Sequence, residues 1–314
     1  MIGALWSRVR NHLYDKGVLS TVRPKEFVIS IGNLTWGGTG KTSLTSYLAK
    51  FLINEGFKVG ILSRGYQRNS RGAVVVSDGQ ELKSAWQNAG DEPYLLARKI
   101  PQAVVVVAES RVEGLPVLSQ FQPDVILLDD AFQHRRIERD LNLVLVDSTE
   151  NILDLHVLPF GKLREPVEGL NRANAIILTH SKNANPETEK AVSGYGVTVY
   201  HANYEATKFD YSGKSIAAFC GIASPQHFRR LLIDNGAKLV LFSEFPDHHV
   251  YSQAEFREFE QAALTSGAEA IVTTAKDAVK LVSEYFHMPL GIVDVEFVIE
   301  EKAQFNSWIL EQLA

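Results

Sequence analysis

The stretch Ile31-Gly-Asn-Leu-Thr-Trp-Gly-Gly-Thr-Gly-Lys-Thr42 decides the fold class of this chain of 314 residues. It follows the apolar run 27–31, which predicts a buried strand, and it precedes residues 43–56, whose apolar side chains recur at helical spacing. Glycines between a strand and a helix let several backbone N–H groups surround an anion, and the helix adds the positive end of its dipole. The sequence therefore predicts an α/β fold of the P-loop NTPase type, with a mostly parallel sheet flanked by helices.

The glycine loop also contains the side chains that a nucleoside triphosphate needs. Lys41 is placed to reach the terminal phosphates, and the hydroxyl of Thr42 is placed to bind Mg²⁺. Thr35 stands where the G-x-x-x-x-G-K-[ST] pattern has its first glycine, but the rest of the pattern is intact. The residues expected to contact the nucleotide are Gly37, Gly38, Thr39, Gly40, Lys41, Thr42 and Ser43.

A second signal is the apolar run Asp124-Val-Ile-Leu-Leu-Asp-Asp130, which ends in paired carboxylates. Such a strand downstream of a P-loop is typical of the Walker B element, which holds Mg²⁺ directly or through water. Asp129 and Asp130 are therefore predicted to be metal ligands together with Thr42. The sequence leaves open which of the two carboxylates contacts the metal.

Polar side chains follow several other predicted strands. In open parallel sheets, ligands bind beyond the carboxyl ends of the strands, so these side chains are candidates for a substrate site, although loop arginines are often only solvated. Planar guanidinium groups suit anionic substrates because they bind phosphate in a bidentate manner. Asp91 stands at a predicted helix start, where it either caps the helix or accepts a proton from a substrate hydroxyl. The candidates for substrate binding are Ser63, Arg64, Arg111, Gln133 and Arg164.

The pattern of strands and helices divides the chain into two α/β units. Residues 24–196 contain the P-loop, residues 197–213 are expected to be an extended linker, and residues 214–314 are expected to form a smaller C-terminal domain. Its last helix is free to pack back on the N-terminal domain. The loop Phe245-Pro-Asp-His-His249 of the second unit is expected to face the cleft between the domains.

Composition narrows the class of protein further. The formal net charge of −5 argues against a surface built for nucleic acid, and the single Cys220 excludes an intramolecular disulfide. No stretch reaches the ~18 to 20 apolar residues of a membrane-spanning helix, and the N-terminus has no signal-peptide core. We therefore expect a cytoplasmic protein that is at most peripheral to a membrane.

Residues 1–23 combine apolar and basic side chains. An apolar face with Trp6 beside a cationic face with Arg8 and Arg10 is typical of a helix at an anionic membrane surface. The same pattern fits a helix that packs on the domain with its charges in water. Both interpretations remain open from the sequence.

A P-loop with a Walker B strand suits either a kinase for a small molecule or lipid, or a GTPase or ATPase switch that works through a partner. A guanine-specific switch should carry Asn-Lys-x-Asp after a late strand. This chain has Thr179-His-Ser-Lys182 after Ile176-Ile-Leu178. The GTPase is therefore disfavoured.

Eight motifs occur in a fixed order along the chain: Gly32-Asn33, Gly37-Gly-Thr-Gly-Lys-Thr42, Ser63-Arg-Gly-Tyr66, Gly90-Asp-Glu-Pro93, Asp129-Asp-Ala-Phe-Gln-His134, Leu163-Arg-Glu-Pro166, Phe245-Pro-Asp-His248 and Lys276-Asp277. Over nearly the whole chain, this ordered set resembles the tetraacyldisaccharide 4′-kinases of lipid A synthesis. Two positions depart from the family pattern: Ser110 stands where an aspartate is expected before Arg111, and Ser43 where many members have proline.

The resemblance implies transfer of a phosphoryl group from ATP, with Mg²⁺, to the 4′-hydroxyl of a tetraacylated glucosamine disaccharide 1-phosphate. The location it implies is the cytoplasmic face of the inner membrane, where residues 1–23 would contact the lipid surface. The alternative is a membrane-associated P-loop ATPase that acts through a protein partner. For the kinase we expect no nucleic acid and no obligatory protein partner.

The resemblance also implies roles for single residues. Lys41 would bind phosphate, Asp91 would be the general base, and His248 would support the charge of Asp91 from the other domain, which closes on the P-loop. The residues that would hold the sugar and its 1-phosphate are Arg111, Gln133 and Arg164.

Overall fold

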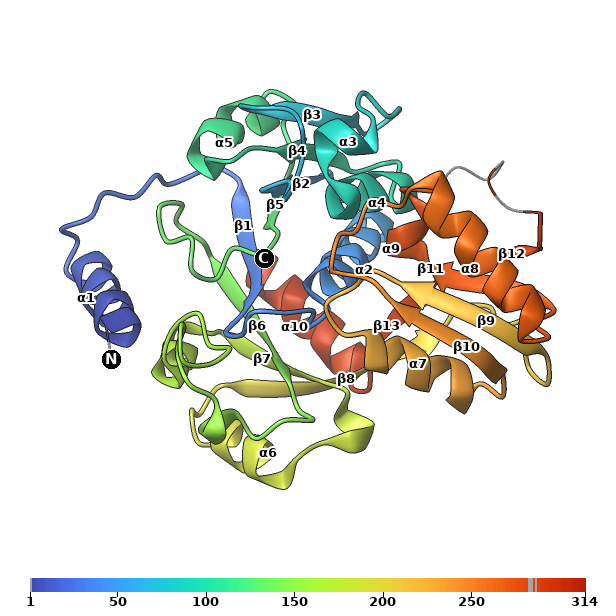
Figure 1. Cartoon of the computed structure of the whole chain (residues 1–314). Helices are drawn as coiled ribbons and strands as arrows, with labels where there is room; N and C mark the ends of the chain where they lie inside the picture. The colour runs from blue at the N-terminus through green and yellow to red at the C-terminus, as the bar shows by residue number, and fades with distance from the viewer. Residues whose placement is uncertain (1, 282–284, 286) are drawn as a thin grey trace.

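The computed structural model describes residues 2–281, 285 and 287–314, and contains two β-sheets with helices around them (Figure 1). Among the described residues, the larger sheet has nine strands and the smaller sheet has four. The prediction of an α/β fold with a mostly parallel sheet is confirmed.

The larger sheet carries the P-loop at its centre. Its strands are β1 (Phe27–Asn33), β2 (Val59–Ser63), β3 (Val74–Asp78), β4 (Val104–Val107), β5 (Val125–Leu128), β6 (Leu141–Asp147), β7 (Ala175–Thr179), β8 (Thr198–Ala206) and β13 (Val295–Ile299). The order is β13-β8-β7-β6-β1-β5-β2-β4-β3, and all neighbours are parallel except the edge pairs β13–β8 and β3–β4. Because β1 and β5 are parallel neighbours, the P-loop and the paired carboxylates leave the sheet at the same edge.

Helices cover both faces of this sheet, and its central strands are buried on both sides. This explains why β1, β4 and β5 read as continuous apolar runs rather than as alternating ones. One core packs against α2 (Lys41–Asn54), α4 (Asp91–Lys99) and α10 (Lys302–Leu313), and another against α5 (Arg111–Ser119). The remaining elements of this unit are α3 (Trp86–Ala89), α6 (Pro186–Ser193), and the 3₁₀ turns η1 (Ile152–Asp154), η2 (Val167–Arg172) and η3 (Ser181–Asn183).

The smaller sheet is parallel throughout, in the order β10-β9-β11-β12. Its strands are β9 (Ser215–Cys220), β10 (Lys238–Glu244), β11 (Ala270–Thr274) and β12 (Leu290–Val293). Phe228 of α7 (Pro225–Asp234) and Phe256 of α8 (Gln253–Thr265) pack in different apolar clusters, with β9 contributing to both, so these helices cover opposite faces. The short α9 (Ala275–Ala278) follows β11 directly.

The segment 197–213 differs from the expected linker. Residues 198–206 are extended, but they form β8 and pair with β7 inside the larger sheet. Burial explains the difference, because Tyr200 and Ala202 pack in the same core as Phe305 of α10. After the smaller sheet, the end of the chain returns to the larger sheet. There β13 pairs with β8, and α10 packs on the larger sheet.

The N-terminal helix α1 (Ile2–Asp15) stands apart from the two sheets (Figure 1). It is held by polar contacts: Asn11 donates to Glu165 at 2.8 Å, and Arg135 bonds Asp15 at 2.7 Å and lies over the ring of Tyr14. Its apolar side chains Leu5 and Trp6 are about two-thirds exposed. Within the described residues, no helix combines the length and the apolar character needed to cross a bilayer.

Candidate active site

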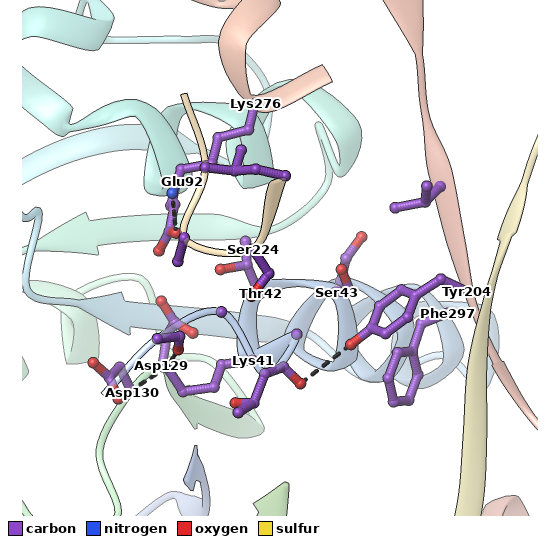
Figure 2. Close-up of a pocket in the computed structure, with 18 of the residues that line it drawn as sticks. Lys41, Thr42, Ser43, Glu92, Asp129, Asp130, Tyr204, Ser224, Lys276 and Phe297 are labelled. Carbon is purple, nitrogen blue, oxygen red and sulfur yellow. Dashed lines mark hydrogen bonds and ion pairs between the residues drawn. The ribbon is translucent and has the colours of Figure 1, made fainter. Parts of the chain in front are cut away.

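The P-loop connects β1 to α2, and Gly40 at the helix start has a left-handed backbone with φ 85°. A Cβ atom at this glycine would lie 1.4 Å from the hydroxyl of Tyr204 on β8. That hydroxyl donates a hydrogen bond of 3.2 Å to the carbonyl of Thr39 (Figure 2). Glycine is therefore required at position 40 by both the backbone angle and the neighbouring ring.

Lys41 extends along the loop toward the paired carboxylates (Figure 2). Its Nζ lies 3.4 Å from the carbonyl of Gly37 and 3.7 Å from the carboxylate of Asp130. Asp130 is also bound by Arg164 at 2.7 Å. Burial raises the pKa of the Asp130 carboxyl, but the charges of Lys41 and Arg164 outweigh it, so this pKa lies below its usual value.

Asp129 lies deeper than Asp130 and is almost fully buried. It accepts hydrogen bonds from Thr45 at 3.2 Å and Ser63 at 3.0 Å, both neutral donors. Burial, followed by the negative charges of Glu92 and Asp130, raises the pKa of the Asp129 carboxyl to about 6. The site thus holds a carboxylate whose negative charge its protein neighbours do not fully compensate.

A third carboxylate, Asp91, begins α4 and is 4% exposed. His248, in the loop between β10 and α8 of the other unit, donates from Nδ1 to its two oxygens at 2.8 and 2.9 Å. The ring of Tyr66 packs against His248 at 5.1 Å between centroids. Residues separated by 157 positions are thereby joined across the two units.

Two lysines of the smaller unit surround this pair. Lys276 bonds Glu92 at 2.9 Å, and the buried Lys280 lies 3.8 Å from Asp91 (Figure 2 shows Lys276 and Glu92). Burial raises the pKa of Asp91, but the His248 hydrogen bond and the charge of Lys276 act against it. The pKa of Asp91 therefore lies below its usual value, and the group is ionised at neutral pH.

With the exception of Thr45 and Lys280, these groups line one cavity of about 1580 Å³ between the two units. The larger sheet contributes the P-loop and the carboxylates, and the smaller unit contributes residues such as Ser224, His248 and Lys276. The arrangement can hold a nucleotide phosphate chain, a divalent cation and a proton acceptor side by side, which is what phosphoryl transfer requires.

Comparison with known proteins agrees with this geometry. A family model described as tetraacyldisaccharide-1-P 4′-kinase matches residues 1–314. The chain belongs to this family. A tetraacyldisaccharide 4′-kinase of Aquifex aeolicus is 39% identical over 279 residues, which cover 87% of this chain and 84% of that protein. One of Chlorobium luteolum is 38% identical over 304 residues, covering 90% and 85%.

A solved structure of the family shows the same fold. The crystal structure of "apo" form LpxK from Aquifex aeolicus in complex with ATP superimposes with a TM-score of 0.81 at 33% identity. The match covers 100% of this chain and 96% of that one. The family resemblance drawn from the ordered motifs is therefore confirmed.

In this member of the 4′-kinase family, every residue that the sequence singled out lines the same cavity. Gln133 donates to the carbonyl of Asn33 at 2.8 Å and to Glu165 at 3.0 Å, and Ser63 donates to Asp129. Arg64 is exposed at the cavity wall. Their part in substrate binding stays a prediction.

Arg111 lies differently from an exposed substrate-binding arginine. It is 5% exposed, and its Nη2 donates to the carbonyls of Asp129 at 2.6 Å and Asp130 at 2.9 Å. These bonds hold the turn in which Asp130 has φ 46°. The contacts observed for Arg111 thus position the paired carboxylates, while its role toward substrate stays a prediction.

Sequence reasoning assigned no role to Glu92, Lys276, Lys280 or Tyr204. Lys276 and Glu92 lay within motifs, but no local pattern indicated that they meet. Tyr204 lay in the segment expected to be a linker. A signal was present for Glu92 and Lys276 alone, as members of the ordered family motifs Gly90-Asp-Glu-Pro93 and Lys276-Asp277.

Proposed function

We propose that this member of the 4′-kinase family transfers the γ-phosphoryl group of ATP to the 4′-hydroxyl of a tetraacylated disaccharide 1-phosphate. The observation that carries the proposal is the Asp91–His248 pair, which faces the same cavity as Lys41 and the paired carboxylates. A sugar hydroxyl is a weak nucleophile, so the reaction depends on alignment, charge neutralisation and proton removal.

Asp91 is the proposed general base. Its lowered pKa keeps it ionised, so it can accept the proton of the attacking hydroxyl as the bond to phosphorus forms. His248 orients the carboxylate and stabilises its charge. Because His248 and Lys276 belong to the smaller unit, the base is complete only when that unit is closed on the P-loop unit.

The residues at the paired carboxylates fit Mg²⁺. The raised pKa of Asp129 marks a buried carboxylate that a cation would stabilise, and carboxylate and hydroxyl oxygens are the donors that Mg²⁺ prefers. Asp129, Asp130 and Thr42 would hold the cation. When bound, it would neutralise negative charge on the phosphates, and Lys41 adds its own positive charge at the loop.

The acceptor side of the cavity combines polar groups with an apolar rim. Arg164, Gln133 and Arg64 offer donors to a sugar and its phosphate, together with Ser63 and Arg111. Trp6, Trp36 and Leu158 line the same cavity and are exposed, which suits the acyl chains of a lipid substrate.

The exposed apolar face of α1 favours contact with a membrane surface. Leu5 is 64% exposed, Trp6 67% and Val9 45%, and the helix also carries Arg8 and Arg10. This supports a peripheral position at the cytoplasmic face of the inner membrane, where the substrate would enter beside Trp6. No nucleic acid and no obligatory protein partner is needed for this reaction.

The proposal is tested by incubating the purified protein with ATP, Mg²⁺ and the disaccharide 1-phosphate in detergent micelles. Mass spectrometry should detect a lipid that has gained one phosphate, and Asp91→Asn should slow the formation of this product about 10²- to 10⁴-fold. ATP hydrolysis that does not depend on the acceptor lipid, with no bisphosphorylated product, would instead favour a P-loop ATPase.

A further inference from the structure

Three side chains of metal-binding type, Asp147, His180 and His227, meet at the active-site cavity, whose wall includes His180 and His227, and none of them has a role in the phosphoryl transfer described above. Asp147 ends β6, His180 follows β7, and His227 lies in the first turn of α7. One ligand atom from each lies within 4.8 Å of those of the other two. Asp147 and His180 belong to the larger sheet and His227 to the smaller unit, so the cluster spans both.

The local structure explains why these side chains converge. β6 and β7 are parallel and pair Asp147 with Thr179, so Asp147 and the residue after β7 emerge at the same edge. His180 has φ 57°, a left-handed conformation that residues other than glycine rarely adopt. Its ring packs against His227 at 3.8 Å and Tyr204 at 5.0 Å between centroids.

Asp147 is held in place by a second layer of contacts. The backbone N–H and the hydroxyl of Thr149 donate to Asp147 Oδ1 at 3.0 and 2.8 Å. Both bonds end on the same oxygen, so within the described part of the chain Oδ2 remains available to a cation. These local bonds form a turn that fixes the orientation of the carboxylate, as outer contacts do for ligands in metal sites.

We propose that Asp147, His180 and His227 bind a divalent cation of the Zn²⁺ type, which links the two units beside the nucleotide site. Two imidazoles and one carboxylate form a zinc ligand set that leaves a fourth position for water. Imidazole nitrogen favours Zn²⁺ over the Mg²⁺ expected at the carboxylate pair. Arg230 lies further along α7 and opposes a cation, but it is exposed to solvent, and Asp147 supplies the compensating charge.

A cation at this site would also hold the start of α7 in place. The loop before α7 lies against the P-loop, since a Cβ on Gly38 would be 3.3 Å from Ala223 and 3.8 Å from the hydroxyl of Ser224. A cation that fixes His227 to Asp147 and His180 therefore holds the start of α7 over the phosphate loop. The site would stabilise the closed arrangement of the two units.

The test measures Zn²⁺ binding to the full chain by calorimetry, with excess Mg²⁺ present to occupy the paired carboxylates. We expect one Zn²⁺ per chain, and Co²⁺ in its place should give the visible absorption of a site with imidazole ligands. His227→Ala and Asp147→Asn should each weaken Zn²⁺ binding roughly 100-fold, and Thr149→Val roughly tenfold.

A control variant separates this site from others. His156→Ala removes an exposed histidine outside the cluster and should leave the Zn²⁺ affinity unchanged. His227 is partly exposed on a helix and Asp147→Asn keeps the side-chain shape, so both variants should fold, which their thermal unfolding will verify. Absence of Zn²⁺ binding by the native chain, or unchanged affinity in both variants, would overturn the proposal.

Discussion

The buried carboxylates on the two sides of the cavity, Asp129 and Asp91, have opposite electrostatic environments. On the metal side, burial and the negative charges of Glu92 and Asp130 outweigh the positive charge of Lys41, and the pKa of Asp129 is raised to about 6. On the base side, Asp91 is equally buried but is bound by His248 and flanked by lysines, and its pKa is lowered. The groups that compensate the negative charge of Asp91 are therefore side chains of the protein itself.

This difference follows from which of the two units supplies the residues on each side of the cavity. The metal side is built within the larger unit, and the charge of Lys41 compensates the buried Asp129 only in part, as would suit a site that takes up a cation. The base side is built from both units, because His248, Lys276 and Lys280 all belong to the smaller one. The proposed base therefore depends on contacts from the smaller unit, whereas the proposed metal site does not.

The largest effect expected concerns the base. Asp91→Asn removes the proton acceptor but keeps the side-chain shape, so kcat should fall about 10²- to 10⁴-fold while ATP affinity stays unchanged. Steady-state kinetics and ATP titration measure the two quantities separately. Asp210→Asn, at an exposed aspartate of the smaller unit, serves as the matched control. A parallel loss of ATP affinity would mean that the two sides are not independent.

Removing the negative charge of Asp129, on the metal side, should increase the stability of the folded chain. Above pH 6, the ionised Asp129 costs folding energy because its folded pKa lies about two units above the unfolded value, which corresponds to roughly 3 kcal/mol as an upper limit. Asp129→Asn should therefore raise the free energy of unfolding at pH 8 without Mg²⁺, and abolish turnover. This gain should shrink as the pH falls from 6 toward 4, since Asp129 then becomes protonated.

Chemical unfolding with and without Mg²⁺ measures this effect. Added Mg²⁺ should stabilise the native chain but not Asp129→Asn. Asp78→Asn is a suitable control because backbone hydrogen bonds, above all that of Glu81, lower the pKa of this carboxyl. Loss of stability in Asp129→Asn would contradict the interpretation that its charge is uncompensated.

A smaller effect is expected when one cation is taken from the base side. Lys276→Gln removes a charge that lowers the pKa of Asp91, so this pKa should rise. A base works only when ionised, so the acid limb of the profile of kcat/KM against pH should move upward. The stability that the ionised Asp91 contributes is present above its unfolded pKa and is lost as the pH falls through its folded pKa, and this loss should also begin at higher pH.

Profiles recorded from pH 4 to 8 test this shift. Lys208→Gln removes an exposed lysine that pairs with Asp210 and should leave the acid limb in place. If the acid limb of Lys276→Gln does not move, another group sets it, and the contrast between the two carboxylates loses its functional meaning.

Short-range patterns in the sequence identify the residues proposed for the metal side more completely than those proposed for the base side, and the reason is physical. Lys41 and Thr42 follow a glycine loop, and Asp129 ends an apolar strand, so short-range patterns identify them. The contact between Asp91 and His248 joins residues 157 positions apart, and it entered the analysis only through the family resemblance. Glu92 and Lys276 meet over a similar separation, and no local pattern specifies such a pair.

The fold shows the same limit, because contacts between distant parts of the sequence leave no local pattern. Continuous apolar runs predicted the central parallel strands, because these strands are buried on both faces. Residues 198–206 alternate buried and exposed side chains over part of their length and were interpreted as a linker, although they form β8 near the sheet edge. Their structure is decided by pairing with β7 and with β13, whose paired residues lie 89 to 97 positions further along the chain.

The smallest effect should come from the hydrogen bond by which Tyr204 of β8 supports the P-loop. Tyr204→Phe removes the hydroxyl that donates to the carbonyl of Thr39, and should lower the free energy of unfolding by about 0.5 to 1.5 kcal/mol. Because Gly40 and Lys41 keep their own backbone geometry, ATP affinity should change by less than about threefold. Tyr195→Phe, at a partly exposed ring, is the control. A large loss of ATP affinity would mean that β8 shapes the phosphate loop, and that the metal side also depends on long-range contacts.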